Sequence, residues 1–268
     1  MRRPRGAALA AALAPLLLLA GCATAPPAPE GWTVRDVTAG GHLLAAATPS
    51  AQRPGSVLTV VIEGDGPAHD PAGRPSADPT PRRPVGLAIA KAWPTGPVAW
   101  LARPCQFTRA RDPACRPETW SRDRFGPAAF AALDAGVDAL KAATGARQVR
   151  LVGWSGGGTM AAALTAARDD VAGLVTFAAP LDIDHWTTAR GLSPLPQAEA
   201  VRGLGSARSP VPQVHLLGAR DRTVRPGEGL ETARRLGVEA QVADEAHDCC
   251  WPHRVGEAVA ALERQARP

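Results

Sequence analysis

The stretch 151–158, LVGWSGGG, places one serine among four glycines directly after an apolar run. A serine in a Gly-x-Ser-x-Gly pattern can attack a carbonyl carbon when a sharp turn presents its hydroxyl. The pattern alone is common enough to arise by chance, so its surroundings must decide. Here a strand-like run precedes it and an alanine-rich, helix-like run follows it, which is the strand–turn–helix context of a nucleophile elbow. The sequence therefore predicts that Ser155 is a nucleophile.

Two phosphate-binding interpretations of the same glycines fail on spacing. A dinucleotide-binding fingerprint requires glycines at its first, third and sixth positions, and no placement of these four glycines supplies that. A Walker A loop requires lysine before the final Ser or Thr, whereas Gly158 is followed directly by Thr159. We therefore expect no nucleotide at this turn.

A serine hydroxyl needs a general base, and the base needs an acid that orients it. Hydrolases with a nucleophile elbow supply these in the chain order Ser, Asp, His. Asp221 lies in the loop after the apolar run 211–219, and His247 follows the run 239–244. The sequence therefore predicts the triad Ser155, Asp221 and His247.

Each partner of the serine has a rival. Asp182 or Asp184, after the preceding apolar run, could supply the acid instead of Asp221. His253 could replace His247 as the base, but the residues after it read as the start of a helix. We therefore favour Asp221 and His247.

The residues around the serine suit a tight turn. Gly153 and Gly157 are expected where strand and helix approach too closely for side chains. Trp154 is expected to pack in the core, with the wall of the acyl pocket as the alternative. Trp186 and Trp251 are expected nearer the mouth of the cleft.

The chain from about Ser56 onward resembles the α/β-hydrolase superfamily through its elbow, its acid loop GARDRTV and its late histidine. With IEGDG, ARPCQF and HDCCW, it resembles a branch of bacterial α/β-hydrolase lipoproteins. The resemblance implies an oxyanion hole built from the backbone N–H groups of Gly156 and Asp65. Glu63-Gly64 replaces the usual His-Gly, and an Asp65 carboxylate near the acyl site would disfavour anionic substrates.

The elements that must position these residues alternate in type. β-Branched runs alternating with alanine-rich runs predict an α/β domain over 32–268, and the resemblance implies a mostly parallel sheet of about eight strands covered on both faces. Residues 182–210 lack periodicity and are expected to form a small cap or loop excursion. Strands are expected within 32–39, 42–49, 56–66, 96–104, 147–154, 171–180, 211–219 and 239–244, and helices within 85–93, 125–144, 157–170, 227–237 and 254–266.

The N-terminus reads as an export signal. Residues 1–21 combine three arginines with an apolar run too short to span a bilayer comfortably. The sequence LAGC ending at Cys22 resembles a lipobox, which implies lipidation of Cys22 and attachment to a membrane on the periplasmic side of a bacterial envelope. Cleavage beside an incidental cysteine is the alternative. Residues 22–31, rich in Pro and Ala, are expected to tether the domain.

Charge argues against a nucleic-acid partner. The formal net charge is +5 over the whole chain. Removal of the three arginines in residues 1–21 lowers it to about +2, which gives no basis for binding nucleic acid. We expect a small-molecule or lipid-like acyl substrate instead.

Four cysteines remain after Cys22 and allow three pairings. Cys105 could pair with Cys115 and close a short loop, or that loop could be bonded to Cys249 or Cys250 beside His247. A bridge between the neighbours Cys249 and Cys250 is geometrically strained and is not expected. No Cys-x-x-Cys motif or spaced histidine pair accompanies them, so no metal is expected.

The leading hypothesis is a lipid-anchored serine hydrolase that cleaves an ester or related acyl bond without a cofactor. A peptidase, thioesterase or acyltransferase would use the same residues. A non-catalytic binding protein of the envelope is the alternative from another class.

Overall fold

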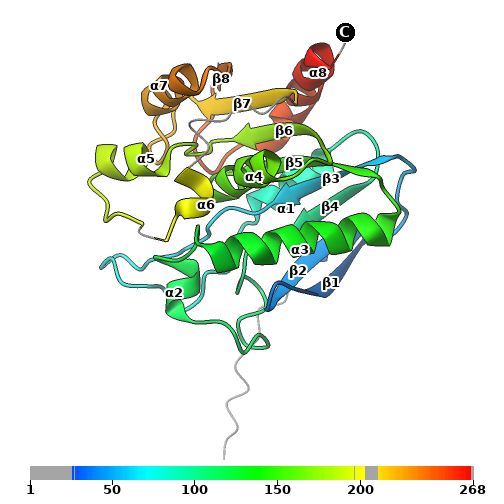
Figure 1. The fold of residues 1–268 in the computed structure, drawn as a ribbon, viewed down its shortest axis with the longest axis horizontal. Coiled ribbons are helices and arrows are strands. Elements are labelled where there is room, and N and C mark those ends of the chain that lie inside the picture. The colour runs from blue at the N-terminus through cyan, green and yellow to red at the C-terminus, as the bar shows by residue number, and fades with distance from the viewer. Residues whose placement is uncertain (1–25, 27, 196, 203–210, 267–268) are drawn as a thin grey trace, which may run out of the picture.

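The computed structural model describes residues 26, 28–195, 197–202 and 211–266, and their strands form one eight-stranded sheet with the order β1-β2-β4-β3-β5-β6-β7-β8 (Figure 1). β1 pairs antiparallel with β2, and β2 with β4, while all remaining neighbours are parallel. The strands are β1 (Trp32–Ala39), β2 (His42–Pro49), β3 (Val57–Ile62), β4 (Val98–Leu101), β5 (Gln148–Trp154), β6 (Val171–Phe177), β7 (Gln213–Gly218) and β8 (Ala240–Ala243).

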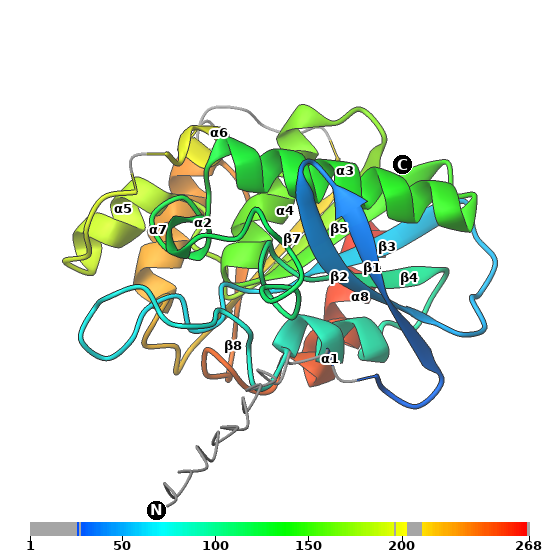
Figure 2. The same cartoon turned by 90° about the horizontal axis from the view of Figure 1, so that it is seen from below.

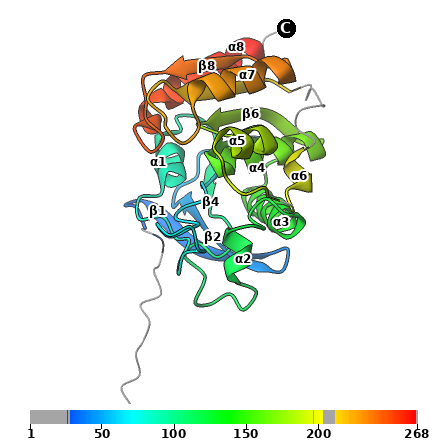
Figure 3. The same cartoon turned by 90° about the vertical axis from the view of Figure 1, so that its left-hand side faces the viewer.

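Helices cover both faces of this sheet, as the alternating pattern predicts. Figures 2 and 3 show α1 and α3 on opposite sides of the sheet. The helices are α1 (Val85–Ala92), α2 (Pro117–Trp120), α3 (Pro127–Thr144), α4 (Gly156–Ala167), α5 (Ile183–Ala189), α6 (Glu199–Arg202), α7 (Pro226–Leu236) and α8 (Val255–Gln265).

The core has two parts because successive side chains of a strand point to opposite faces. In β3, Val60 and Ile62 belong to the cluster that packs under α3 and α4, whereas Val61 belongs to the cluster under α1 and α8. All three are fully buried. The central strands therefore read as continuous apolar runs, which is typical of parallel sheets covered on both faces.

The predicted mostly parallel sheet of about eight strands is confirmed. The region 182–210 contains two short helices, α5 and α6, that the hydrophobic pattern did not reveal. Residues 196 and 203–210 of that region lie outside the description, as do the predicted signal peptide 1–21, Cys22 and residues 23–25 and 27 of the tether 22–31. No helix in the described part of the chain is long and apolar enough to cross a membrane.

A buried histidine in β7 makes the fold sensitive to acid. Burial lowers the pKa of His215 from 6.5 to about 4, and its Nδ1 lies 2.9 Å from the Thr176 hydroxyl. The unfolded chain therefore binds more protons than the folded chain between these pH values. We expect the free energy of unfolding to fall by about 3 kcal/mol as the pH drops from 7 to 4 on account of this group.

Urea denaturation at pH values from 7.5 to about 4.5 measures the effect. A His215→Asn variant, whose amide can still reach Thr176, should lose less stability over this range than the wild type. Equal losses in the two proteins would contradict the assignment to His215.

Candidate active site

Ser155 lies on the turn between β5 and α4, with φ 53° and ψ −130°. Its N–H donates to the Phe177 carbonyl at a distance of 2.8 Å, which ties the turn to β6. Both flanking glycines are sterically required: a Cβ on Gly153 would lie 2.5 Å from the Gly158 nitrogen, and one on Gly157 2.7 Å from the Glu63 carbonyl carbon. The turn is thus the strained strand-to-helix connection of a nucleophile elbow.

Ser155, His247 and Asp221 form one chain of hydrogen bonds. His247 Nε2 lies 3.0 Å from Ser155 Oγ, and His247 Nδ1 lies 2.7 Å from Asp221 Oδ2. The other Asp221 oxygen, Oδ1, accepts the backbone N–H groups of Thr223 and Val224 at 2.7 and 2.8 Å. Asp221 is therefore fixed on both oxygens, and the imidazole can accept the serine proton through Nε2.

Two tryptophans hold the backbone of His247. The indole nitrogens of Trp154 and Trp251 both donate to the His247 carbonyl, at 2.8 and 2.9 Å. Trp154 also packs its ring against the imidazole, with 5.3 Å between centroids. Trp251 is completely buried against Phe177, so the expectation that it lies near the cleft mouth was wrong. It supports the histidine from inside the core instead.

The rival residues lie in other surroundings. Asp182 caps α5 by accepting the His185 N–H and pairs with Arg235. Asp184 pairs with Arg202, and His253 is exposed in a short 3₁₀ segment after Cys250. The structure therefore brings Asp221 and His247 to the serine and leaves the alternatives elsewhere.

The two predicted oxyanion donors lie beside each other. Gly156 begins α4, so its N–H has no acceptor within the helix. No hydrogen bond from the N–H of Gly156 or Asp65 is recorded within the described residues. The Asp65 side chain lies against Gly156, where a Cβ would come 2.6 Å from the carboxylate carbon. Gly156 follows Ser155 in the chain, and Asp65 lines the same cleft as Ser155.

Glu63, which stands in place of the usual histidine, anchors the loop that carries Asp65. Its carboxylate accepts four N–H groups, from the backbones of Gly64, Gly86 and Leu87 and from the Trp100 indole, at 2.9–3.2 Å. Burial raises the pKa of Glu63, and these four bonds oppose the rise. Because Gly86 and Leu87 open α1, Glu63 joins the end of β3 to the N-terminus of that helix.

Two buried arginines hold the Asp65 carboxylate. Arg103 Nη1 donates to Oδ1 at 3.0 Å, and Arg124 Nε donates to Oδ2 at 2.9 Å. Arg103 also donates to the Arg124 carbonyl, and Arg124 to the Ser121 carbonyl at 2.6 Å. The expectation that Asp65 would disfavour anionic substrates did not take into account the positive charges of Arg103 and Arg124. Sequence reasoning missed both, because an arginine after a strand or in a loop reads as a surface residue.

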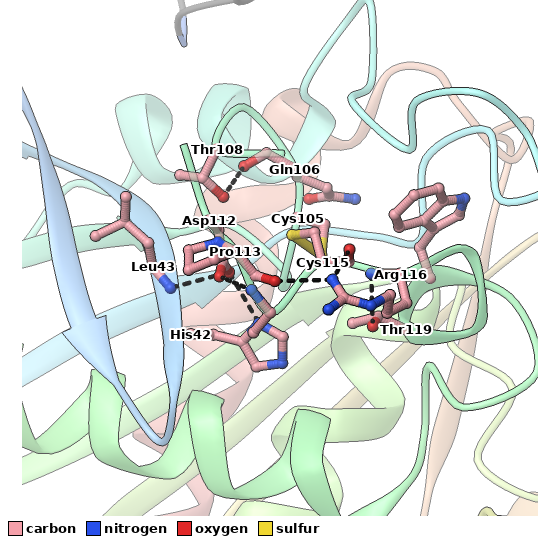
Figure 4. The surroundings of a disulfide bond; sticks show 12 residues. His42, Leu43, Cys105, Gln106, Thr108, Asp112, Pro113, Cys115, Arg116 and Thr119 are labelled. Carbon is pink, nitrogen blue, oxygen red and sulfur yellow. Dashed lines mark hydrogen bonds and ion pairs between the residues drawn. A yellow bond between two sulfur atoms is a disulfide. The ribbon is translucent and has the colours of Figure 1, made fainter. Parts of the chain in front are cut away.

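Two residues after Arg103, a disulfide between Cys105 and Cys115 closes a short loop (Figure 4). The Gln106 side chain in this loop donates to the Gly64 carbonyl at 2.7 Å. This bond holds the segment that carries Asp65. His42 and Asp112 lie beside the disulfide, with 2.9 Å between Nδ1 and Oδ2. Ligand atoms of these four side chains lie within 4.8 Å of one another. The sulfur atoms of Cys105 and Cys115 are bonded to each other. In this oxidised form neither cysteine has the thiolate that binds a metal.

The expectation that Cys249 and Cys250 do not pair was wrong, because the structure joins them in a disulfide. The peptide bond between them is cis, and their Cα atoms lie 3.2 Å apart. The proposed bond from the Cys105 loop to this pair does not form.

A cleft of about 360 Å³ opens above these residues. Ser155, His247 and Asp65 lie on its floor and sides, and Trp154 and Trp186 add aromatic surface. Trp154 is buried and also lines the cleft, so both of the positions considered for it apply. Trp186 lines the cleft, as expected. His69 from the proline-rich loop after β3 is the remaining titratable residue of the lining.

Solved structures with this fold were found by structural comparison, although no protein-family model and no curated protein sequence matches the chain. An alpha-beta serine hydrolase homologue from Coxiella burnetii is 15% identical with a TM-score of 0.59, covering 90% of this chain and 99% of its own. The esterase Pf2001 from Pyrococcus furiosus is 18% identical with a TM-score of 0.58, covering 90% and 97%. A serine hydrolase without lid, XC6422 from Xanthomonas campestris, is 15% identical with a TM-score of 0.58, covering 90% and 97%. At these identities the likeness is one of fold.

Proposed function

We propose that this chain, which has the α/β-hydrolase fold, is a serine hydrolase that cleaves an ester or related acyl substrate. The observation that carries the proposal is the unbroken path of hydrogen bonds from Asp221 through His247 to Ser155. A path of this kind ending on a strained turn is what activation of a serine hydroxyl requires. The esterase and serine hydrolase names of the structural neighbours agree with it.

The first half of the reaction transfers the acyl group to the enzyme. Ser155 Oγ attacks the carbonyl carbon while its proton moves to His247 Nε2, and the carbonyl oxygen becomes an oxyanion. The N–H groups of Gly156 and Asp65 would bind that oxygen. When the carbon–oxygen bond to the leaving group breaks, His247 returns the proton to the departing alcohol. Asp221 holds the imidazole and stabilises its charged form.

The second half repeats these steps with water. His247 takes a proton from water as the oxygen attacks the acyl carbon, and the bond to Ser155 Oγ then breaks. The proton returns to the serine, the acid leaves, and the enzyme is restored.

We also propose that the protein is held at the bacterial envelope by lipid on Cys22. The proposal rests on the sequence of residues 1–22 alone. A Cys22→Ala variant expressed in a bacterial host should then leave the membrane fraction for the soluble fraction. Equal membrane content in both proteins would remove the basis for the anchor.

A fluorophosphonate probe tests the catalytic proposal, because it phosphonylates only a serine whose hydroxyl is activated. We expect the wild type to take up about one probe per chain at Ser155, located by peptide mass spectrometry. Ser155→Ala, purified in parallel with a matched melting temperature, should take up none. A wild type that resists labelling, or a label that persists in the variant, would refute the assignment.

A further inference from the structure

We propose that the cleft selects acyl substrates that carry a negative charge, such as a carboxylate, close to the bond that is cleaved. The proposal deepens the serine hydrolase function of Ser155 and rests on it. It is carried by the cations behind and around Asp65, which outnumber the acidic groups that compensate them.

The first observation is a buried cluster of two cations and one anion. The side chains of Arg103 and Arg124 are 5% and 9% exposed, and that of Asp65 between them is 20% exposed. Arg103 Nε is buried without a hydrogen-bond partner in the described structure. Burial lowers the pKa of Arg103, Asp65 opposes that fall, and Arg124 adds to it. Arginine stays ionised at such a site, so the cluster keeps one positive charge in excess.

The excess charge acts on the cleft. The cavity enclosed by Asp65, Arg103 and Arg124 measures about 10 Å³, too small for a substrate, so a substrate meets the cluster from the cleft side. At His69, on the cleft wall, burial and then the charge of Arg124 lower the pKa, while Asp65 and Asp70 each raise it by less than Arg124 lowers it. The charge of Arg124 is therefore felt at the cleft wall in spite of the Asp65 carboxylate.

The second observation concerns the cleft rim. Arg82 follows Pro81 of the lining and Arg222 precedes Thr223 of the lining; both arginines are exposed, and no ion pair is recorded for either within the described chain. Asp248 is an exposed acid that follows His247 of the lining.

The other acidic groups near the cleft have partners. Asp221 lies behind His247, where it accepts hydrogen bonds from two backbone N–H groups and contacts His247 Nδ1, and its negative charge opposes that of the arginines. Asp70 is paired with Arg74, and Asp182 with Arg235. Glu63 is occupied by four N–H groups on the side of α1. Such an arrangement draws anions toward the cleft and repels cations.

Matched esters of equal chain length measure the preference. We compare kcat/KM for mono-4-nitrophenyl adipate, an anion, with that for neutral 4-nitrophenyl hexanoate. A second pair, 4-acetoxybenzoate and 4-acetoxybenzamide, places the charge on the leaving group. We expect the anion-to-neutral ratio of at least one pair to fall about 10-fold from low to high ionic strength. A ratio that is constant or rises with salt in both pairs would overturn the proposal.

Charge variants locate the effect. Arg222→Gln and Arg124→Gln should each lower the ratio several-fold, and Asp248→Asn should raise it. Arg147→Gln is the matched control, because Arg147 is exposed before β5 at the opposite end of the sheet. Arg222 lies on the surface, so its variant tests the proposal even if the buried Arg124→Gln variant fails to fold. Equal ratios in wild type and Arg222→Gln would count against the proposal.

Binding separates this proposal from the catalytic one. Ser155→Ala cannot hydrolyse the esters, so isothermal titration can compare its affinity for the adipate and hexanoate esters directly. Several-fold tighter binding of the anion at low salt supports charge selection even if the wild type hydrolyses neither ester. Equal affinities together with labelled Ser155 would overturn charge selection and leave the hydrolase assignment standing.

Discussion

Ser155→Ala is expected to lower kcat for 4-nitrophenyl acetate by a factor on the order of 10⁵, with little change in KM. The variant keeps the turn, the cleft and both oxyanion N–H groups, but it has no atom to attack the carbonyl carbon. Alanine at φ 53° is no more strained than serine, so the fold should survive. Stopped-flow and steady-state release of 4-nitrophenol measure the loss, and the circular dichroism melt checks the fold.

In the proposed mechanism the three residues act as a unit, which gives this prediction a strict control. In the proposed mechanism His247 acts on the serine proton and then on the water that attacks the acyl-enzyme. Because no acyl-enzyme forms without Ser155, the double variant Ser155→Ala, His247→Ala should be no slower than Ser155→Ala alone. A second large drop in the double variant would show that His247 works independently of the serine. A Ser155→Ala variant with near-normal kcat would place the reaction elsewhere.

Asp221→Asn should lower kcat by about 10⁴ while leaving the fold in place. Oδ1 of Asp221 accepts two backbone N–H groups, from Thr223 and Val224. The asparagine oxygen must keep that position, so its NH₂ group faces His247 Nδ1. Nδ1 then has to accept, and the ring proton moves to Nε2, which faces Ser155 Oγ at 3.0 Å. The histidine can no longer take the serine proton because Nε2 already carries one.

Asp182→Asn is the matched control for this substitution. Asp182 also follows a parallel strand and also accepts a backbone N–H, from His185, but it lies outside the hydrogen-bond path to the serine. Its kcat should stay within about 2-fold of the wild type. If Asp182→Asn were the slow variant and Asp221→Asn the fast one, the acid would be misassigned.

Local sequence determined most of the fold. Strands such as β3 and β5 are short runs of apolar residues bounded by turn formers, and α3 and α4 are alanine-rich, so each element carries its own signal. The elbow was readable for the same reason, since Gly153 and Gly157 are needed within five residues of each other. α5 and α6 were missed because four to seven residues are too few to show a helical period.

The partners of Ser155 were predictable from order and spacing, because the elements between them must fit one sheet. The sequence favoured Asp221 and His247 over the other aspartates and histidines without excluding them. In the folded chain these two residues lie in the hydrogen-bond path to Ser155. The disulfide between Cys249 and Cys250 was not expected, because the sequence alone left the pairing of four cysteines open.

The features that could be predicted from the sequence are therefore local: the elements, the elbow and the residue types of the proposed triad. The surroundings of the site became visible only in the folded chain. Arg103 and Arg124 reach Asp65 across 38 and 59 residues of sequence, and Trp251 turns into the core to hold His247. Contacts of this kind depend on how strands and loops pack in space. The sequence around a residue does not show which charged side chains from distant segments will lie beside it after folding.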